Sequence, residues 1–455
     1  MLQPDTLAGG ASLSSGTAQG YLPNNTSSTD YIGRSFIAIA RFGLYAFVTI
    51  ALCTTHLLLP VERGFPPVRI AGLPFTVTIL VTVAAFLLLT VESKGKILYK
   101  LPKHYLPFQS VFVWLLVASA ILAPNVRSAF FVVLSYASVF ILTFLEVRYL
   151  FHRGFRTYFV YILALTAGVA AVIGLIEGLT GAPIPFYTAI LINNAPEESA
   201  YWLTRTDYRI FGTLGNPIVY SAAMILAIPF ALELRPALLK YGLVIALLSA
   251  AALAVSTTAF LMASVVLVGY LIVFRIKLTT MLFLATLASI LIWLLTPVLI
   301  ARFGEGALMR IVSGDPRNVT ARLDMLDLAW NDFSTDQTFG SVLFGKGLKS
   351  TTIDEYASAN NRAVGTIDNT YATLLVETGV VGLVVYLVMA FSILFPMRRF
   401  AFSSMHWYGV LSLFAAGVAF TTIYYSTFNF VWVASVATLV YYEHQRTLAI
   451  NRGVS

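Results

Sequence analysis

Charged residues are scarce in this chain of 455 residues. Asp, Glu, Lys and Arg make up only 11% of it, whereas 58% of the residues are hydrophobic. Soluble domains contain about 25% charged residues, so this composition excludes an ordinary soluble protein. Cysteine is scarcer still. The single Cys53 has no partner in the chain, which excludes an internal disulfide and a zinc site built from cysteines.

The chain instead contains long runs of apolar residues. A helix that crosses a bilayer needs about 20 mostly apolar residues, and about 12 runs of suitable length lie between residues 36 and 442. We therefore expect an all-α, polytopic integral membrane protein with about 12 transmembrane helices. The polar triplet from Ser256 to Thr258 interrupts a run that is too long for one span, and it predicts a tight reversal there.

These runs also predict how the chain is organised. The N-terminal residues are polar and contain no apolar core of a cleavable signal sequence. The expected segments are a disordered cytoplasmic tail (1–34), the first nine transmembrane helices (35–298) with an outer loop (177–216), a large outer loop (299–370), the last three transmembrane helices (371–442) and a second cytoplasmic tail (443–455).

The net charge of +8 raises the question of nucleic acid binding, and the placement of the basic residues answers it. They are concentrated in every second connection between the predicted helices, such as the one that holds Lys94, Lys96, Lys100 and Lys103. Few of them lie in the short connections that alternate with these. This asymmetry is the one described by the positive-inside rule. We interpret the charge as a topology signal that places both termini in the cytoplasm, and we expect no nucleic acid partner.

The large outer loop contains one segment with helical periodicity. Over residues 318–333, Leu323, Leu326, Trp330 and Phe333 recur at the spacing of one helix face. We expect an amphipathic helix that lies over the membrane face. Such a helix could plug the helix bundle or, in an enzyme, form a lid over the site.

A first polar motif leads into the sixth predicted span. It brings Arg209, Gly212 and Gly215 to the start of that helix, where Asn216 and Pro217 follow. Asn is a good N-cap and Pro a good first helical residue, so capping alone accounts for the last two. Arg209 is left unexplained by capping, and its guanidinium could hold a phosphate through two parallel hydrogen bonds.

A second polar motif opens the tenth predicted span with Asp368, Asn369 and Tyr371. Asp368 or Asn369 could be a simple cap, and a carboxylate at the mouth of a membrane cavity could also serve as a general base. Glu377 lies about 13 Å further along the helix and on its opposite face, so it is not expected to form a catalytic pair with Asp368. At that depth it needs a hydrogen-bonding or basic partner, which favours a structural role. The glycine-containing segment 343–348 reads as a turn.

In this order and spacing, the motifs resemble the O-antigen ligase and polysaccharide polymerase superfamily. The resemblance extends over residues 160–395. It rests on four groups of residues, which are Arg209 to Pro217, Arg322 with Trp330 in the loop, the Gly345-Lys346-Gly347 turn, and Asp368-Asn369-x-Tyr371 followed by Glu377, Gly379 and Gly382.

The resemblance implies a fold and an activity. The fold would be GT-C-like, and the protein would be a glycosyltransferase at the periplasmic face of a bacterial inner membrane. Donor and acceptor would be glycans on undecaprenyl diphosphate, with no cofactor, nucleotide sugar or required metal. Membrane lipids, a flippase and a chain-length regulator would be further partners. Transfer would be an in-line displacement with inversion.

The resemblance also implies roles for particular residues. Arg209 and Arg322 would hold the diphosphate, because a developing negative charge needs cations. Asp368 would be the base that activates the acceptor hydroxyl. The supporting residues would be Asn216, Asn369, Tyr371 and Glu377.

The sequence departs from the ligase pattern at two places, and the first of these departures favours a polymerase. Ligases carry histidine where this chain has Asp368, and they carry arginine after the serine of the reversal, where Thr257 follows Ser256 here. The second departure leaves one phosphate contact unassigned. His56, near the outer face, is interpreted as an anchor at the level of the headgroups.

Two alternatives to a polymerase stay open. One is a ligase that transfers the finished glycan to lipid A core. The other, from a different class, is a transporter or flippase in which Arg209, Arg322 and Asp368 line a solute path. Transporters commonly show internal repeats and broken helices near the membrane midplane. The sequence shows no clear repeat, and these three residues cluster toward the outside.

Overall fold

The computed structural model describes most of the helical part of the chain. It covers residues 28–59, 68–70, 73–98, 105–181, 210, 212–214, 216–254, 256–275, 316–335, 338–350, 369–418, 422 and 426–452. The chain divides into two compact units, residues 1–47 and residues 48–455. In the first unit, residues 28–47 form the beginning of helix α1 (Ser28–Leu57), ahead of the expected start at 36.

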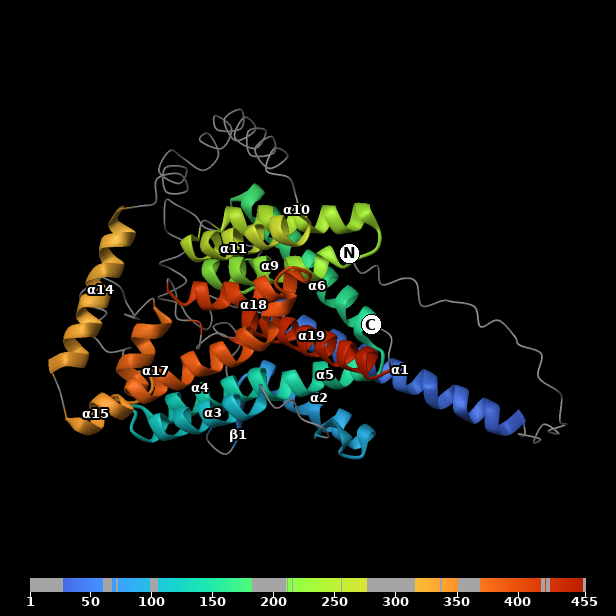
Figure 1. Cartoon of the computed structure of the whole chain (residues 1–455), viewed down its shortest axis with the longest axis horizontal. Helices are drawn as coiled ribbons and strands as arrows, with labels where there is room; N and C mark the ends of the chain where they lie inside the picture. The colour runs from blue at the N-terminus through green and yellow to red at the C-terminus, as the bar shows by residue number, and fades with distance from the viewer. Residues whose placement is uncertain are drawn as a thin grey trace, which may run out of the picture. The chain divides into compact units, whose positions relative to one another are not determined.

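Helices dominate the second unit (Figure 1). They are α2 (Val77–Ser93), α3 (Leu106–Ile121), α4 (Val126–Ala137), the π-helix η2 (Ser138–Thr143), α5 (Phe144–His152), α6 (Arg156–Thr180), the 3₁₀ turn η3 (Gly212–Leu214), α9 (Pro217–Leu232), α10 (Ala237–Leu253), α11 (Thr257–Val273), α14 (Pro316–Thr335), α15 (Phe339–Phe344), α17 (Thr370–Met397), α18 (Met405–Ala416) and α19 (Ser426–Asn451).

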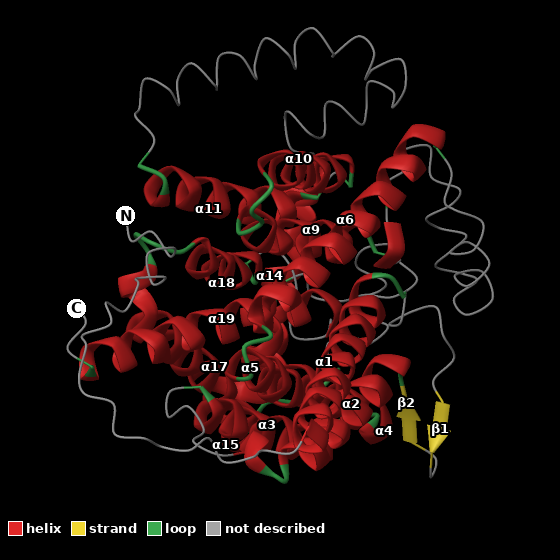
Figure 2. Cartoon of the chain, turned by 90° about the vertical axis from the view of Figure 1, so that its right-hand side faces the viewer, coloured by secondary structure: helices red, strands yellow, loops and turns green. Residues whose placement is uncertain are grey.

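The described residues also contain one small hairpin and two further 3₁₀ turns. Strands β1 (Val68–Ile70) and β2 (Leu73–Phe75) pair antiparallel, with Val68 opposite Phe75. Figure 2 shows this hairpin at the edge of the helices. The turns are η1 (Lys96–Leu98) and η4 (Arg398–Phe400). The expected all-α class is therefore confirmed apart from this short hairpin.

Four described helical stretches are long and apolar enough to cross a membrane. They are Ser35–Leu57, Val126–His152, Arg156–Thr180 and Thr370–Phe400. Shorter apolar helices accompany them, namely Val77–Ser93, Leu106–Ile121, Pro217–Leu232, Ala237–Leu253 and Thr258–Val273. These apolar helices agree with the expected integral membrane protein. The span expected over 280–298 lies outside the described residues.

Several predicted boundaries differ from the structure. Helix α18 ends at Ala416, within the segment 371–442 in which the last three transmembrane helices are expected. Helix α19 continues to Asn451, through most of the tail expected over 443–455. The predicted reversal after α10 is confirmed, because the side chain of Ser256 caps α11 by accepting a hydrogen bond from the Ala259 amide at 3.3 Å.

Helix α9 lies in the interior of the second unit. All of its residues except Ile218 are buried, and it packs against α6, α10, α11, α18 and α19. Its Tyr220 hydroxyl donates to the Ala170 carbonyl of α6 at 2.9 Å. A Cβ atom at Gly174 would lie 2.1 Å from that hydroxyl, so a glycine is required where α6 meets α9. This contact holds in place the helix that follows the first polar motif.

Candidate active site

The start of α17 is tied to the end of α18 by three consecutive residues. Asn369 caps the helix by accepting from the Ala372 amide at 3.0 Å, and it donates to the Val418 carbonyl at 2.9 Å. The Thr370 amide donates to Gly417 at 2.8 Å. The Tyr371 hydroxyl donates to the Phe414 carbonyl of α18 at 2.7 Å. The predicted cap at Asn369 is confirmed, and the helix start has a fixed position.

A second set of hydrogen bonds links this helix start to α19. The Thr370 hydroxyl accepts from the Thr422 amide at 2.8 Å and lies 3.1 Å from the Thr422 hydroxyl. Asn429 of α19 donates to the Thr422 carbonyl at 2.9 Å. All three side chains are buried. The sequence analysis missed Thr370, because nothing local distinguishes a buried, bonded threonine from an exposed one.

The segment 343–348 is more than a turn, because its backbone joins two distant helices. The Lys346 amide donates to the Val376 carbonyl at 2.9 Å and the Gly347 amide to the Glu377 carbonyl at 3.1 Å. The Leu348 amide donates to Ser119 of α3 at 3.2 Å. The Ser119 hydroxyl in turn donates to the Glu377 carbonyl at 2.7 Å. We call residues 345–348, together with Ser119 and residues 376–379, the glycine junction.

Glycine is required at this junction. Gly345, Gly347 and Gly379 all have positive φ. A Cβ atom at Gly347 would lie 2.6 Å from the backbone of Ala123 at the end of α3. The backbone of α17 is non-helical at Gly379, where the two helical parts of α17 meet. The close approach of these backbones explains why Gly345, Gly347 and Gly379 are glycines.

The side chain of Glu377 is completely buried in α17. Its charge acts on Lys349, which follows the glycine junction. Burial lowers the pKa of the Lys349 ammonium below its ordinary value, and the carboxylate of Glu377 opposes that change. Lys349 is thus a basic group close enough for the charge of Glu377 to act on it, in line with the hydrogen-bonding or basic partner that we expect for Glu377.

The predicted amphipathic helix exists as α14, and it packs on α17. Ala329 is buried against Val376, with Phe333 and Ala372 beside them. The Lys346 ammonium of the glycine junction forms an ion pair with Asp332 at 2.6 Å. Trp330 lies beside Phe333, with ring centroids 6.0 Å apart, and 61% of it is exposed. The small side chain of Ala329 lies against α17, which lets the helices approach closely.

The first polar motif is built into the ends of α1 and α6. The Asn216 side chain caps α9 by accepting from the amides of Ile218 at 2.9 Å and Val219 at 3.3 Å, as predicted. The Gly212 amide donates to the buried carboxylate of Glu177 at 2.8 Å, and the Thr213 hydroxyl donates to the Leu57 carbonyl at 2.6 Å. Gly212 has positive φ and packs on the Tyr220 ring.

These contacts bring the two polar motifs to the same region. His56, at the end of α1, stacks on Phe430 near the start of α19, with ring centroids 4.5 Å apart. We call this region, formed by the ends of α1, α6 and α18 and the starts of α9, α17 and α19, the motif end. His56 is completely buried there, so the interpretation of it as an anchor at the headgroups is wrong.

The three residues with predicted chemical roles are described incompletely or not at all. Arg209 and Asp368 lie outside the described residues. Arg322 lies within α14, and its side chain is outside the described part. The supporting residues Asn216, Asn369, Tyr371 and Glu377 all contribute to the motif end or the glycine junction, through the contacts given above. Among the described residues, no cluster of three or more His, Cys, Asp or Glu could hold a metal ion.

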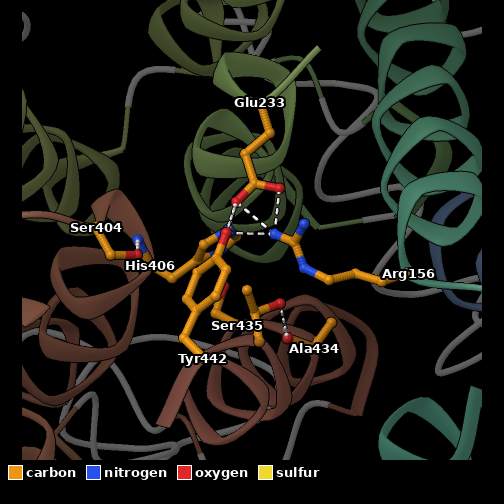
Figure 3. Close-up of polar contacts among 8 residues, drawn as sticks. Arg156, Glu233, Ser404, His406, Ala434, Ser435 and Tyr442 are labelled. Atoms are coloured by element: carbon orange, nitrogen blue, oxygen red, sulfur yellow. Dashed lines mark hydrogen bonds and ion pairs between the residues drawn. The ribbon is translucent and has the colours of Figure 1, made fainter. Parts of the chain in front are cut away.

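A polar network lies at the other end of these helices. Figure 3 shows Arg156, His406 and Tyr442 converging on Glu233, which directly follows α9. The distances to its carboxylate are 2.5 Å from Arg156, 3.0 Å from the His406 ring and 2.6 Å from the Tyr442 hydroxyl. Burial alone would raise the pKa of Glu233, but the three partners together lower it to about 2. The network joins α6, α9, α18 and α19.

The fold and the motif end define a helical integral membrane protein with a polar site assembled from several helix ends. Residues 242–387 match the family model described as O-antigen ligase. This match confirms the resemblance to the O-antigen ligase and polymerase superfamily over that part of the chain, which includes α14, the start of α17, and residues 345–348 and 376–379 of the glycine junction. No curated protein and no solved structure matches the chain.

Proposed function

We propose that this protein is a polysaccharide polymerase. It joins repeat units carried on undecaprenyl diphosphate at the periplasmic face of the inner membrane, in the assembly of O-antigen or exopolysaccharide. The family match over 242–387 supports glycan transfer of the ligase or polymerase type. The preference for a polymerase rests on Asp368, which stands where ligases carry histidine.

The observation that supports this proposal most is the fixed start of α17. Asn369, Thr370 and Tyr371 each bond to the segment that ends α18. Asp368 directly precedes this fixed helix start in the sequence. A general base needs such a position, because its distance to the reacting hydroxyl must be held within a few tenths of an ångström.

The mechanism assigns one task to each polar group. Asp368 takes the proton of the acceptor hydroxyl, whose oxygen attacks the anomeric carbon of the donor sugar from the face opposite the diphosphate. The bond from that carbon to the diphosphate oxygen breaks, its electron pair leaves with undecaprenyl diphosphate, and the anomeric configuration inverts. Arg209 and Arg322 bind the charge of the leaving diphosphate. The packing of α14 on α17 supports a role for Arg322 near this site.

The topology that we propose follows from the basic residues. Arg153, Arg156, Arg235 and Lys240 lie at or near the helix ends around the Glu233 network. The positive-inside rule assigns this end to the cytoplasm. The motif end then faces the periplasm, where lipid-linked repeat units are presented. About 12 transmembrane helices in a GT-C-like arrangement, with both termini in the cytoplasm, belong to the same proposal.

A ligase is the second candidate, and the description of the matching family favours it. Purified protein supplied only with lipid-linked repeat units separates the two activities. A polymerase makes a ladder of longer lipid-linked chains and releases one undecaprenyl diphosphate for each linkage, because donor and acceptor are the same kind of molecule. A ligase leaves the units unjoined until lipid A core is added. A transporter or flippase releases no diphosphate under either condition.

The result that overturns the polymerase proposal is therefore specific. It is the absence of a ladder from repeat units alone, together with product formation when lipid A core is supplied. In that case the ligase alternative holds, and Asp368 does not distinguish the two activities.

A further inference from the structure

His56 is a buried polar residue that packing does not account for. It lies in the last turn of α1 and has no exposed surface. Within the described part of the chain, neither of its ring nitrogens has a hydrogen-bond partner. A buried donor or acceptor left unpaired costs about 1–3 kcal/mol of folding free energy. Phenylalanine at this position would keep the ring and avoid that cost.

The aromatic contact of the His56 ring is apolar. The ring lies parallel to that of Phe430, with an interplanar angle of 4° and centroids 4.5 Å apart. Two phenyl rings could form the same stack. The nitrogens of His56 thus lower stability without contributing to the stack, and residues retained at such a cost are typical of functional sites.

The position of His56 connects it to both polar motifs. The carbonyl of its neighbour Leu57 accepts from Thr213, between Gly212 and Asn216 of the first motif. Its stacking partner Phe430 follows Asn429, which bonds through Thr422 to Thr370 at the start of α17. His56 therefore precedes a residue that bonds the first motif, and it stacks on a residue that follows the hydrogen bonds to the start of α17. It also lies outside the residues 242–387 that match the family model.

We propose that His56 is a substrate-binding residue of the motif end and that its ring nitrogens hydrogen-bond a hydroxyl group of the lipid-linked glycan. A neutral imidazole offers one donor and one acceptor. A sugar hydroxyl matches it, because a hydroxyl can both donate and accept, whereas a phosphate oxygen only accepts. The ring is covered in this structure, so side chains around it move when the glycan binds. This inference rests on the proposed glycan transfer.

Two substitutions separate a role of the nitrogens from a role of the ring. His56→Phe keeps an aromatic ring that can stack on Phe430 and removes both nitrogens. His56→Gln removes the ring and keeps one donor and one acceptor. Transfer by each variant is measured as diphosphate release from lipid-linked repeat units, with and without added lipid A core, and is normalised to the amount of folded protein.

The expected result is that kcat/KM falls about tenfold or more in His56→Phe, the loss expected for one substrate hydrogen bond. His56→Gln should retain more transfer than His56→Phe, while thermal unfolding in detergent should show His56→Phe to be at least as stable as the wild type. If His56→Phe is as active as His56→Gln or more active, the ring alone matters and the inference is overturned. Failure of the proposed function is distinguishable in the wild type itself, which would release diphosphate only with added lipid A core if it is a ligase, and none under either condition if it transfers no glycan.

Discussion

Gly345 and Gly379 lie so close together that neither position has room for a side chain. A Cβ atom added to Gly379 would lie 2.6 Å from the backbone nitrogen of Gly345 and 2.3 Å from the Leu343 carbonyl oxygen. One added to Gly345 would lie 2.3 Å from the carbonyl carbon of Glu377. The segment 343–345 thus contacts α17 directly through its backbone, at a helix break where φ is 68° and ψ is −171°.

Gly379→Ala should therefore destabilise the protein strongly. This backbone conformation is one that essentially only glycine adopts, and the added methyl group would collide with fixed backbone atoms. We expect the free energy of unfolding to fall by about 3 kcal/mol or more, measured by thermal unfolding in detergent. Gly340→Ala in α15 is the matched control, because a Cβ atom there meets nothing within 4 Å. Equal stability of the two variants would contradict the close contact.

The ion pair between Lys346 and Asp332 should hold α14 on α17. Both side chains are about one quarter exposed, so its contribution is modest. Asp332→Asn should speed hydrogen exchange of the α14 amides about fivefold, corresponding to about 1 kcal/mol. Asp327→Asn, at an exposed position of the same helix, should leave exchange unchanged. A double-mutant cycle with Lys346→Met that shows no coupling would argue against the pair.

The Glu233 network should make stability depend on pH in the acid range. The pKa of Glu233 is about 2 in the folded protein and 4.5 ordinarily, so protons bind the unfolded chain more tightly. The stabilisation is complete above pH 4.5 and is lost as the pH falls toward 2. Its size is on the order of 3 kcal/mol, from about 1.4 kcal/mol for each pH unit.

Glu233→Gln tests this contribution directly. The variant should be less stable at neutral pH by about 2 kcal/mol or more, because Arg156 loses its carboxylate partner, and the change in stability between pH 4.5 and 2 should largely disappear. Glu443→Gln is the control, because Glu443 pairs with Arg399 at a more exposed site and should cost less than about 1 kcal/mol. A wild-type pH dependence in Glu233→Gln would assign the effect to other groups.

Asp368→Asn should abolish most polymer formation. Asparagine keeps the size and capping ability of the side chain and removes its basicity, so we expect transfer to fall by about 10²-fold to 10⁴-fold. The measurement is the ladder from lipid-linked repeat units, with Asp327→Asn as the control. Normal ladders from a well-expressed Asp368→Asn protein would rule out Asp368 as the general base.

Arg209→Lys and Arg322→Lys should each lower turnover by about tenfold or more. Lysine keeps the charge but loses the planar pair of donors that binds a diphosphate bidentately. The readout is release of undecaprenyl diphosphate from purified protein that unfolds at the wild-type temperature. Arg399→Lys, which changes an arginine of the η4 turn, should be neutral. Undiminished turnover in both Arg209→Lys and Arg322→Lys would contradict the proposed binding of the diphosphate by these two arginines.

Local signals in the sequence predicted local structure well. The caps at Asn216, Ser256 and Asn369 were predictable because a capping side chain bonds to an amide two or three residues away. The apolar runs and the period of α14 were predictable for the same reason. Periodicity did not indicate that Ala329 is the residue of α14 that is buried against Val376 of α17, because it predicts an apolar face and not its neighbour.

The sequence by itself determined that this is a helical membrane protein, because about 20 apolar residues can satisfy their backbone in lipid only as a helix. It also determined the caps and the motifs that resemble the superfamily. The tertiary structure alone decided that the charge of Glu377 acts on Lys349, that Thr370 bonds Thr422, and that His56 is buried and stacks on Phe430. These pairings join residues far apart in the chain, and their partners are chosen by how the helix ends meet in space.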